Sequence, residues 1–213
     1  MKLISEKIDV QNKILDCLIS IGWDYLPPSD ILVLRGGNLK EPFLTSIAKE
    51  KLKKLNKKLI TNANVDDVIR RLRFLPANIN GNEDFLNFLR GRKTVYYKKE
   101  KRERNIRFID YEEPKNNSFI ITQEFEFEDR DIRRADIILF INGFPIGIIE
   151  NKSPTVEEAK EEAFSQITFY NDVLPELFKF IQFYATCDGI RLYYGPTWKY
   201  ESKTFYRWKC ENG

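Results

Sequence analysis

Residues 135–152, ADIILFINGFPIGIIENK, decide the centre of the fold. Two apolar runs, Ala135–Ile141 and Phe144–Glu150, flank the dipeptide Asn142-Gly143. Asn-Gly between apolar runs is a strong short-range signal for a β-hairpin, because both residues tolerate the positive φ angles of a tight turn. The stretch therefore predicts two adjacent antiparallel strands that meet at Asn142-Gly143.

Three ionisable residues stand out on this hairpin: Asp136, Glu150 and Lys152. Glu150 and Lys152 are two residues apart, so on a strand they point to the same face. Two carboxylates can hold a divalent cation that lowers the pKa of a bound water, and a lysine can orient or deprotonate that water. These residues are our candidates for phosphodiester hydrolysis. The alternative is a structural ion-pair set or solvated strand ends.

The register of the hairpin offers a geometric check of a shared metal site. A regular two-residue turn would pair Asp136 with Ile149 and place Asp136 on the face opposite to Glu150. A shared metal requires both carboxylates on one face. It therefore predicts a three-residue loop or a bulge, and Pro145 and Gly147 are residues expected near such an irregularity.

Hydrophobic periodicity predicts the other elements. Helical spacing predicts helices over 6–20, 41–59, 65–75, 83–89 and 155–173. Period-two alternation and short apolar runs predict strands over 93–98, 106–111, 118–127, 180–186 and 190–194. This order predicts an α/β (α+β) fold in which helices flank a central mixed sheet.

The composition bounds the chemistry. The chain has 213 residues, 42% hydrophobic and 31% charged, which excludes a disordered chain, a disulfide miniprotein and a collagen-like fibre. It contains no histidine, which excludes Ser-His-Asp and Cys-His catalysis and His-ligated zinc. A metal must then be held by oxygen, which points to Mg²⁺, Mn²⁺ or Ca²⁺.

The sequence also predicts a cytoplasmic location. No stretch approaches the ~18 apolar residues of a membrane span, and the charged N-terminus does not resemble a signal peptide. The three cysteines, Cys17, Cys187 and Cys210, are far apart and form no CxxC pair, which argues against a disulfide framework or a zinc ribbon.

Two further polar residues lie in the helix expected after the hairpin. Gln166 and Tyr170 are four residues apart, so they share one helix face. Gln166 could hydrogen-bond Lys152 or a substrate phosphate, and the Tyr170 hydroxyl could do the same. The alternative is that both only complete the packing of the helix on the sheet.

Several segments together resemble a known family. RRADIILFINGFPIGIIENKSP, the later QITFY and CDGIRLYYG, and the earlier FLNFLRGRKTVYYKKE are similar to the N-terminal nuclease domain of the R subunit of Type I restriction–modification enzymes. The resemblance implies an endonuclease of the PD-(D/E)xK superfamily that requires Mg²⁺, with Mn²⁺ as a substitute. Asp136 and Glu150 would match its metal ligands, Lys152 its catalytic lysine, and Gln166 with Tyr170 its QxxxY motif.

The resemblance also implies an organisation and partners. Residues 1–213 are expected to form one endonuclease domain, with a mainly helical part over 1–91 and a sheet core over 92–200 that holds the catalytic hairpin 135–152 and the helix 155–173. Such domains precede an ATP-driven translocase. The sequence contains no GxxxxGK(S/T) phosphate-binding loop, so we expect the translocase to be absent from this chain. The subunit would join modification and specificity subunits on double-stranded DNA.

The sequence departs from the family pattern at two places. Ala135 stands where the motif has proline. The first helix of such nucleases often carries a glutamate beside the active site, and Gln11 occupies that place here, with Glu6 and Asp9 nearby.

Basic residues suggest contacts with DNA. Arg130, Arg133 and Arg134 come just before Asp136, and with Lys152 they are our candidates for sequence-independent phosphate contacts. The lysine-rich run 49–58 and the basic segment 98–104 could contact phosphates in the same way. The alternatives for 49–58 are a solvated helix face or a contact with a partner subunit or the motor.

Alternatives remain at two levels. Asp110 and Glu124 could join a second metal. At the level of function, the chain could be chiefly a DNA- or subunit-docking module, or a PD-(D/E)xK nuclease of DNA repair.

Overall fold

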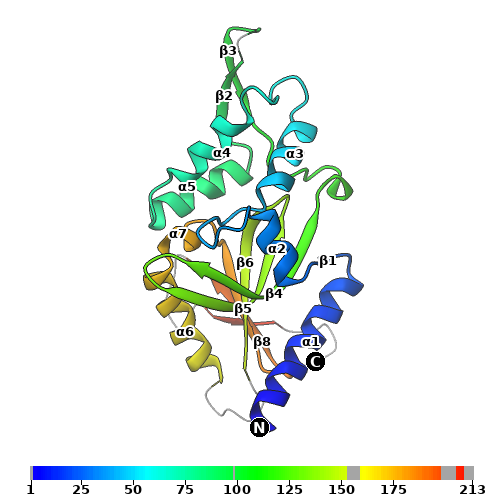
Figure 1. Cartoon of the computed structure of the whole chain (residues 1–213), viewed down its shortest axis with the longest axis vertical. Helices are drawn as coiled ribbons and strands as arrows, with labels where there is room; N and C mark the ends of the chain where they lie inside the picture. Colours follow the sequence, from blue (N-terminus) through cyan, green and yellow to red (C-terminus); the bar gives the residue numbers. More distant parts are fainter. Residues whose placement is uncertain (1, 98, 153–158, 198–204, 209–213) are drawn as a thin grey trace.

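A seven-stranded mixed sheet forms the centre of the computed structural model, which describes residues 2–97, 99–152, 159–197 and 205–208 (Figure 1). Its strands lie in the order β1 (Asp24–Tyr25), β4 (Phe119–Glu128), β5 (Ile132–Ile141), β6 (Phe144–Asn151), β7 (Phe183–Cys187), β8 (Leu192–Pro196) and β9 (Tyr206–Arg207). The pairs β1–β4 and β6–β7 are parallel, and the other neighbours are antiparallel. The predicted mixed sheet is confirmed, and it is consistent with a restriction-endonuclease-like fold.

Seven helices surround this sheet in the described part of the chain. They are α1 (Lys2–Ser20), α2 (Pro28–Leu34), α3 (Thr45–Leu55), α4 (Val65–Arg73), α5 (Ile79–Leu89), α6 (Ala159–Val173) and α7 (Pro175–Phe178), with a short 3₁₀ turn, η1, at Pro114–Asn116. None of the helices in these ranges has the length and apolar character needed to cross a membrane.

Helices α1 and α6 cover opposite faces of the sheet (Figure 1). Leu15 of α1 packs in one buried cluster with Ile137 and Ile149, and Ile167 of α6 packs in the other with Ile148. Neighbouring residues of one strand thus enter different clusters, because side chains alternate across a sheet. All eight residues of β6 are buried, as expected for a central strand covered on both faces.

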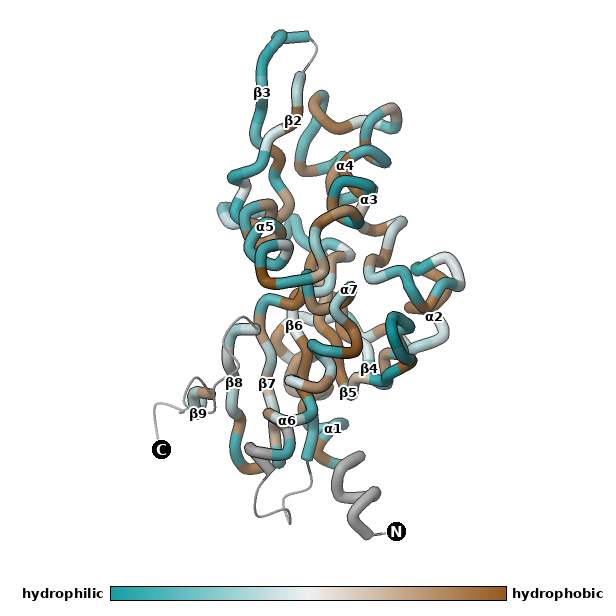
Figure 2. Tube along the Cα trace, turned by 90° about the vertical axis from the view of Figure 1, so that its left-hand side faces the viewer, coloured by the Kyte–Doolittle hydropathy of each residue, from teal (hydrophilic) through white to brown (hydrophobic). Residues whose placement is uncertain are grey.

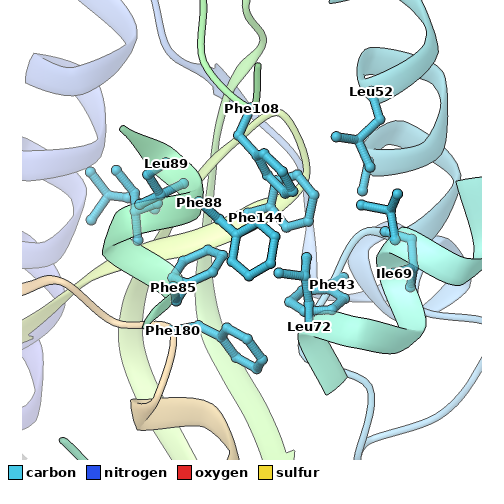
Figure 3. Close-up of a cluster of buried hydrophobic side chains, with 14 of the residues drawn as sticks. Phe43, Leu52, Ile69, Leu72, Phe85, Phe88, Leu89, Phe108, Phe144 and Phe180 are labelled. Carbon is cyan, nitrogen blue, oxygen red and sulfur yellow. The ribbon is translucent and has the colours of Figure 1, made fainter. Parts of the chain in front are cut away.

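A second layer of packing joins the helices α3, α4 and α5 to the turn of the hairpin (Figure 3). Phe144, the first residue of β6, contacts the ring of Phe43 with centroids 5.3 Å apart, and Phe43 contacts Phe180 at 4.7 Å. Phe85 completes this group at 5.0 Å from Phe180. Such edge-to-face pairs add to the stabilisation from burial. The hairpin therefore begins inside an aromatic core.

The Asn142-Gly143 turn is held from both sides. Both residues have positive φ, 52° and 82°, as a two-residue hairpin turn requires. The Asn142 side chain donates to Phe108 O and Asn117 Oδ1 and accepts from Ser118 N, each at 2.8 Å. Gly143 O accepts from Leu44 N at 2.9 Å, just before α3.

The predicted bulge is present in β6. Beside the turn, Ile141 pairs with Phe144 and Phe140 with Pro145, but the next pair is Leu139 with Gly147. Ile146 is thus the extra residue, and the register shifts by one position. The structure has the two-residue turn and the bulge together, and the prediction that the pairing departs from a regular hairpin is confirmed.

One strand prediction is wrong. Residues 106–111 form no strand, and β2 (Thr94–Tyr97) pairs instead with β3 (Arg102–Asn105), which lies between the two predicted strands. Ile106 and Phe108 alternate because both are buried in the core as parts of a loop. The backbone of Arg107 makes two hydrogen bonds with the Asn56 side chain. Asn56 Nδ2 donates to Arg107 O, and Arg107 N donates to Asn56 Oδ1, each at 2.7 Å.

Most other predicted elements are confirmed with shifted bounds. Helix α3 begins at Thr45 rather than at residue 41, and α5 begins at Ile79 because Asn78 caps it, its side chain accepting from the backbone N–H of Asn80 and Gly81. Helix α2, helix α7 and the short strands β1 and β9 carry too little periodicity to be predicted. The first residues of the predicted helix 155–173, up to residue 158, lie outside the described residues.

The contact at the hairpin turn can be tested with two glycines. A Cβ on Gly143 would lie 2.7 Å from both Leu44 O and Ala48 N, whereas Gly37 has a similar φ of 72° and open space. We expect Gly143→Ala to lower the free energy of unfolding by about 1–3 kcal/mol more than Gly37→Ala, because backbone atoms must move apart. Urea denaturation of both variants measures the difference. An equal loss of unfolding free energy in the two variants would contradict the close approach of Gly143 to the start of α3.

Candidate active site

The bulge places Asp136 opposite Glu150. The pairs Ile137–Ile149 and Ile138–Ile148 follow the shifted register, and one further step along it aligns the two carboxylates. Glu150 has 0% and Asp136 7% of its surface exposed. Asp136 Oδ2 accepts a hydrogen bond from Asn151 N at 2.8 Å, across the two strands. Two acidic groups thus meet at the end of the hairpin away from its turn.

Gln166 of α6 bridges the hairpin residues. Lys152 Nζ donates to Gln166 Oε1 at 2.6 Å, and Gln166 Nε2 donates to Glu150 Oε2 at 2.7 Å. The same Nε2 also donates to the Tyr170 hydroxyl at 2.8 Å. Lys152, Glu150, Gln166 and Tyr170 therefore form one network, which the structure assembles from a strand end and a helix face.

Tyr170 ties this network to β5. Its hydroxyl donates to Arg134 O at 2.9 Å, two residues before Asp136. Burial, together with the negative charge of Glu150, raises the pKa of Tyr170 well above its ordinary value. The phenol consequently stays protonated at neutral pH and remains a hydrogen-bond donor. Helix α6 is thus fixed to both strands that carry the carboxylates.

The parallel strand β7 fixes the position of Lys152. Glu150 pairs with Thr186 and Asn151 with Cys187, and Lys152 N donates to Cys187 O at 2.9 Å. This last backbone bond lies just beyond the end of β6. The lysine therefore leaves the sheet at a defined point.

Gln11 reaches the site from α1, on the side where the family resemblance suggested a glutamate. It is 5% exposed, and its Nε2 lies 3.2 Å from Asp136 O and 3.4 Å from Glu124 Oε1. Asp9 is exposed, and the side chain of Glu6 lies outside the described ones. The first helix thus contributes an amide that contacts the backbone of Asp136.

The two acids considered for a second metal lie in different places. Glu124 stands opposite Asp136 on β4, has a positive φ of 51°, and pairs with Arg134 Nε at 2.7 Å. Asp110 caps the loop before η1, accepting from Glu113 N at 3.2 Å and from Asn116 Nδ2 at 2.9 Å. That loop contacts the hairpin turn, so Asp110 is at the far end of β5 from Asp136.

Of the three arginines predicted to contact DNA, Arg133 and Arg134 lie on β5 close to Asp136, whereas Arg130 lies further away, in the β4–β5 turn. Arg134 is exposed beside Glu124, and the Arg133 guanidinium lies 5.0 Å from the centre of the Phe169 ring on α6. Arg130 is exposed and donates to Asp172 O at the end of the same helix, at 3.0 Å. The positive groups therefore follow the edge shared by β5 and α6.

The roles of two main-chain groups at the site could not be predicted from the sequence. The Asn151 N–H and the Arg134 carbonyl each hold a predicted residue in place, but any residue type could supply them. Glu124 was noted as an acid, and its position beside Asp136 depends on a positive φ that its residue type does not indicate.

The donor set suits a hard divalent cation at the Asp136–Glu150 pair. Acidic side chains directly opposite each other on neighbouring strands repel, and a cation shared between them would offset this repulsion. Carboxylate oxygens are the ligands that Mg²⁺ and Mn²⁺ favour. The described residues hold no cluster of three or more His, Cys, Asp or Glu side chains able to bind a metal. Asp136 and Glu150 are the two carboxylates that could hold such a cation.

Comparison with known proteins identifies the family. Residues 4–203 match the family model described as the Type I restriction enzyme R protein N terminus. The chain is 32% identical over 193 residues to the "Type I restriction enzyme HindI endonuclease subunit" of Haemophilus influenzae, a match covering 85% of this chain and 18% of that protein. It is 30% identical over 219 residues to the "Putative type I restriction enzyme MjaVIIIP endonuclease subunit" of Methanocaldococcus jannaschii, covering 99% and 21%.

These matches fix the family and the extent of the likeness. The chain spans about a fifth of the length of the curated relatives. The family match covers most of the chain, including every residue of the Asp136–Tyr170 network. The chain therefore belongs to the family of N-terminal domains of Type I restriction enzyme R proteins.

Proposed function

We propose that this domain is a metal-dependent DNA endonuclease that hydrolyses phosphodiester bonds. The observation that carries the proposal is the single network that joins Lys152, Gln166 and Glu150, with Asp136 opposite Glu150 in the register. A structural ion-pair set would need only the charged groups. The amide between them and the bulge that aligns the acids are additional features with a direct use in catalysis.

Each residue has a separate task. Asp136 and Glu150 would hold Mg²⁺, which when bound supplies a polarised phosphate and a water of lowered pKa. Lys152, held through Gln166, orients the attacking water and offsets negative charge that develops on the phosphate. Tyr170 keeps Gln166 in place through its hydroxyl. Lys152 and Gln166 are half-buried, so they form the part of the network nearest to solvent.

The relatives suggest the wider setting. Their names describe endonuclease subunits of Type I restriction enzymes. We place this domain in such an assembly, with double-stranded DNA as substrate, modification and specificity subunits as partners, and ATP-driven translocation supplied by a motor of the assembly. Arg130, Arg133 and Arg134 would contact phosphates beside the site, without reading sequence.

Metal binding tests the two carboxylates directly. We expect Asp136→Asn to weaken Mn²⁺ binding at least tenfold in titration calorimetry, because an amide is a poor ligand for a hard cation. Asp131→Asn is the matched control, since this acid lies on the approach to β5 and pairs with Arg133. The control should bind Mn²⁺ as the wild type does.

Two outcomes would contradict the metal site. One is equal Mn²⁺ affinity of wild type and Asp136→Asn. The other is no binding by the folded wild type both alone and with a short DNA duplex.

Cleavage by the complete assembly tests the lysine. Lys152→Ala should reduce DNA cleavage by a factor of about 10² or more, the range for loss of a group that acts in the transition state. ATP hydrolysis and translocation should stay close to wild type, because the substitution lies at the nuclease site. Gel assays of cleavage and a coupled ATPase assay measure the two activities.

The same assay separates catalysis from docking. A docking module predicts unchanged cleavage in Lys152→Ala and Glu150→Gln provided the assembly still forms. Unimpaired cleavage by both variants would therefore replace the nuclease proposal with the docking one.

A further inference from the structure

The β2–β3 hairpin projects from the helical end of the molecule, beyond α3 and α4 (Figure 1). All four residues of β3 are exposed, and they colour as hydrophilic in Figure 2. The strands pair only with each other, in a separate two-stranded sheet. An isolated two-stranded ribbon is marginally stable and adds little to a core. Packing therefore does not account for the sequence of β3, whereas Val95 of β2 packs against the core.

A basic groove of about 750 Å³ lies between this hairpin and the C-terminal end of α3. Its lining contains six basic side chains and two acidic ones. The basic residues are Lys54, Lys57, Lys58, Arg102, Arg104 and Arg107, and the acidic ones are Glu100 and Glu103. We call this feature the hairpin groove. Its cations come from two segments, 54–58 and 102–107, that are far apart in the sequence.

The cations of the hairpin groove are partly available to a ligand, although Arg107 pairs with Asp110 and Glu112 at 3.5 and 3.4 Å. Arg102 and Arg104 share one acid, Glu100, at 2.7 and 3.6 Å, and their side chains are 61% and 46% exposed. Within the described part of the chain, the exposed Lys57 and Lys58 take part in no ion pair or hydrogen bond through their side chains. Like charges gathered at one place repel, so an anion bound there would be stabilised.

The two walls of the hairpin groove are held together by a buried amide. Asn56 is 7% exposed and follows α3 directly. Its side chain bonds both the N–H and the carbonyl of Arg107, each at 2.7 Å, and also Leu52 O at 2.8 Å. The backbone at Arg107, just after β3, is therefore held in a fixed relation to the end of α3, which the lysines 57 and 58 follow. The positions of the two groove walls relative to each other are thus fixed by the hydrogen bonds of a buried side chain, unlike those of independent surface charges.

We propose that the hairpin groove binds the phosphate backbone of double-stranded DNA, as a contact separate from the Asp136–Glu150 site. The network at that site lies at the end of the hairpin 135–152 away from its turn, whereas the hairpin groove lies between the C-terminal end of α3 and the β2–β3 hairpin. The β2–β3 hairpin projects at the end of the molecule opposite to the N-terminal end of α1 (Figure 1). The contact would hold a stretch of duplex at the opposite end of the domain from the cleaved bond.

Shape and chemistry favour duplex DNA over an acidic protein. A projecting two-stranded ribbon has the form that a DNA groove admits. Lysines and arginines spread along a groove match regularly spaced phosphates, whereas a stable protein interface generally has an apolar centre. The hairpin groove offers mainly charge, with Leu55 and Leu59 as its aliphatic residues. The expected binding is independent of sequence and sensitive to salt.

Duplex binding by this chain, measured in EDTA by fluorescence polarisation, tests the proposal without any cleavage. The groove variant carries Lys54→Gln, Lys57→Gln, Arg102→Gln and Arg104→Gln. The matched control carries Lys40→Gln, Lys115→Gln, Arg70→Gln and Arg90→Gln, which remove the same charges from exposed positions outside the hairpin groove. We expect at least tenfold weaker binding in the groove variant and less than twofold change in the control. The slope of log affinity against log salt should fall by about 2 to 4.

The outcome is independent of the nuclease proposal. The comparison is repeated in an Asp136→Ala background, where the loss from the groove substitutions should be the same. Equal affinity of groove variant and wild type, or an equal loss in the control, would overturn the proposal. Failure of Mn²⁺ binding or of cleavage would leave it untouched. Circular dichroism confirms that each variant is folded before binding is compared.

Discussion

Ile146, the one extra residue in β6, sets which side chains can meet in this domain. Without it the acid of β5 and the acid of β6 would face opposite sides of the sheet. With it, Asp136 and Glu150 stand opposite each other, and α6 can reach both Glu150 and Lys152 through one amide. The bulge is held in place at both ends, by the anchored turn on one side and by paired strands on the other.

The Asn142-Gly143 turn is itself held in place by the helices of the first half of the chain. Gly143 approaches the start of α3 so closely that no side chain fits there, and Phe144 enters the aromatic cluster beside it. The helical layer therefore does more than cover a sheet end. It fixes the starting point from which the register of the hairpin is counted, some twenty ångströms along the strand from the carboxylates.

Sequence reasoning found the parts of this arrangement that local rules control. The Asn142-Gly143 turn, the helix bearing Gln166 and Tyr170, and the need for a bulge all follow from period, turn chemistry and side-chain alternation. It missed what tertiary packing decides. Ile106 and Phe108 alternate like a strand but are core residues of a loop whose backbone bonds go to Asn56. The positive φ of Glu124, the contact of Gln11 with Asp136 and the backbone partners of Asp136 and Tyr170 have no local pattern at all.

The bridging amide of Gln166 has a consequence for how the two charged groups of the network communicate. An amide accepts from the ammonium at its oxygen and donates to the carboxylate from its nitrogen, and it is neutral throughout the physiological range. It therefore transmits position between Lys152 and Glu150 but cannot carry a proton from one to the other. The ammonium and the carboxylate are therefore held at a fixed separation by a group that does not itself exchange protons, and a shift of α6 would move both together.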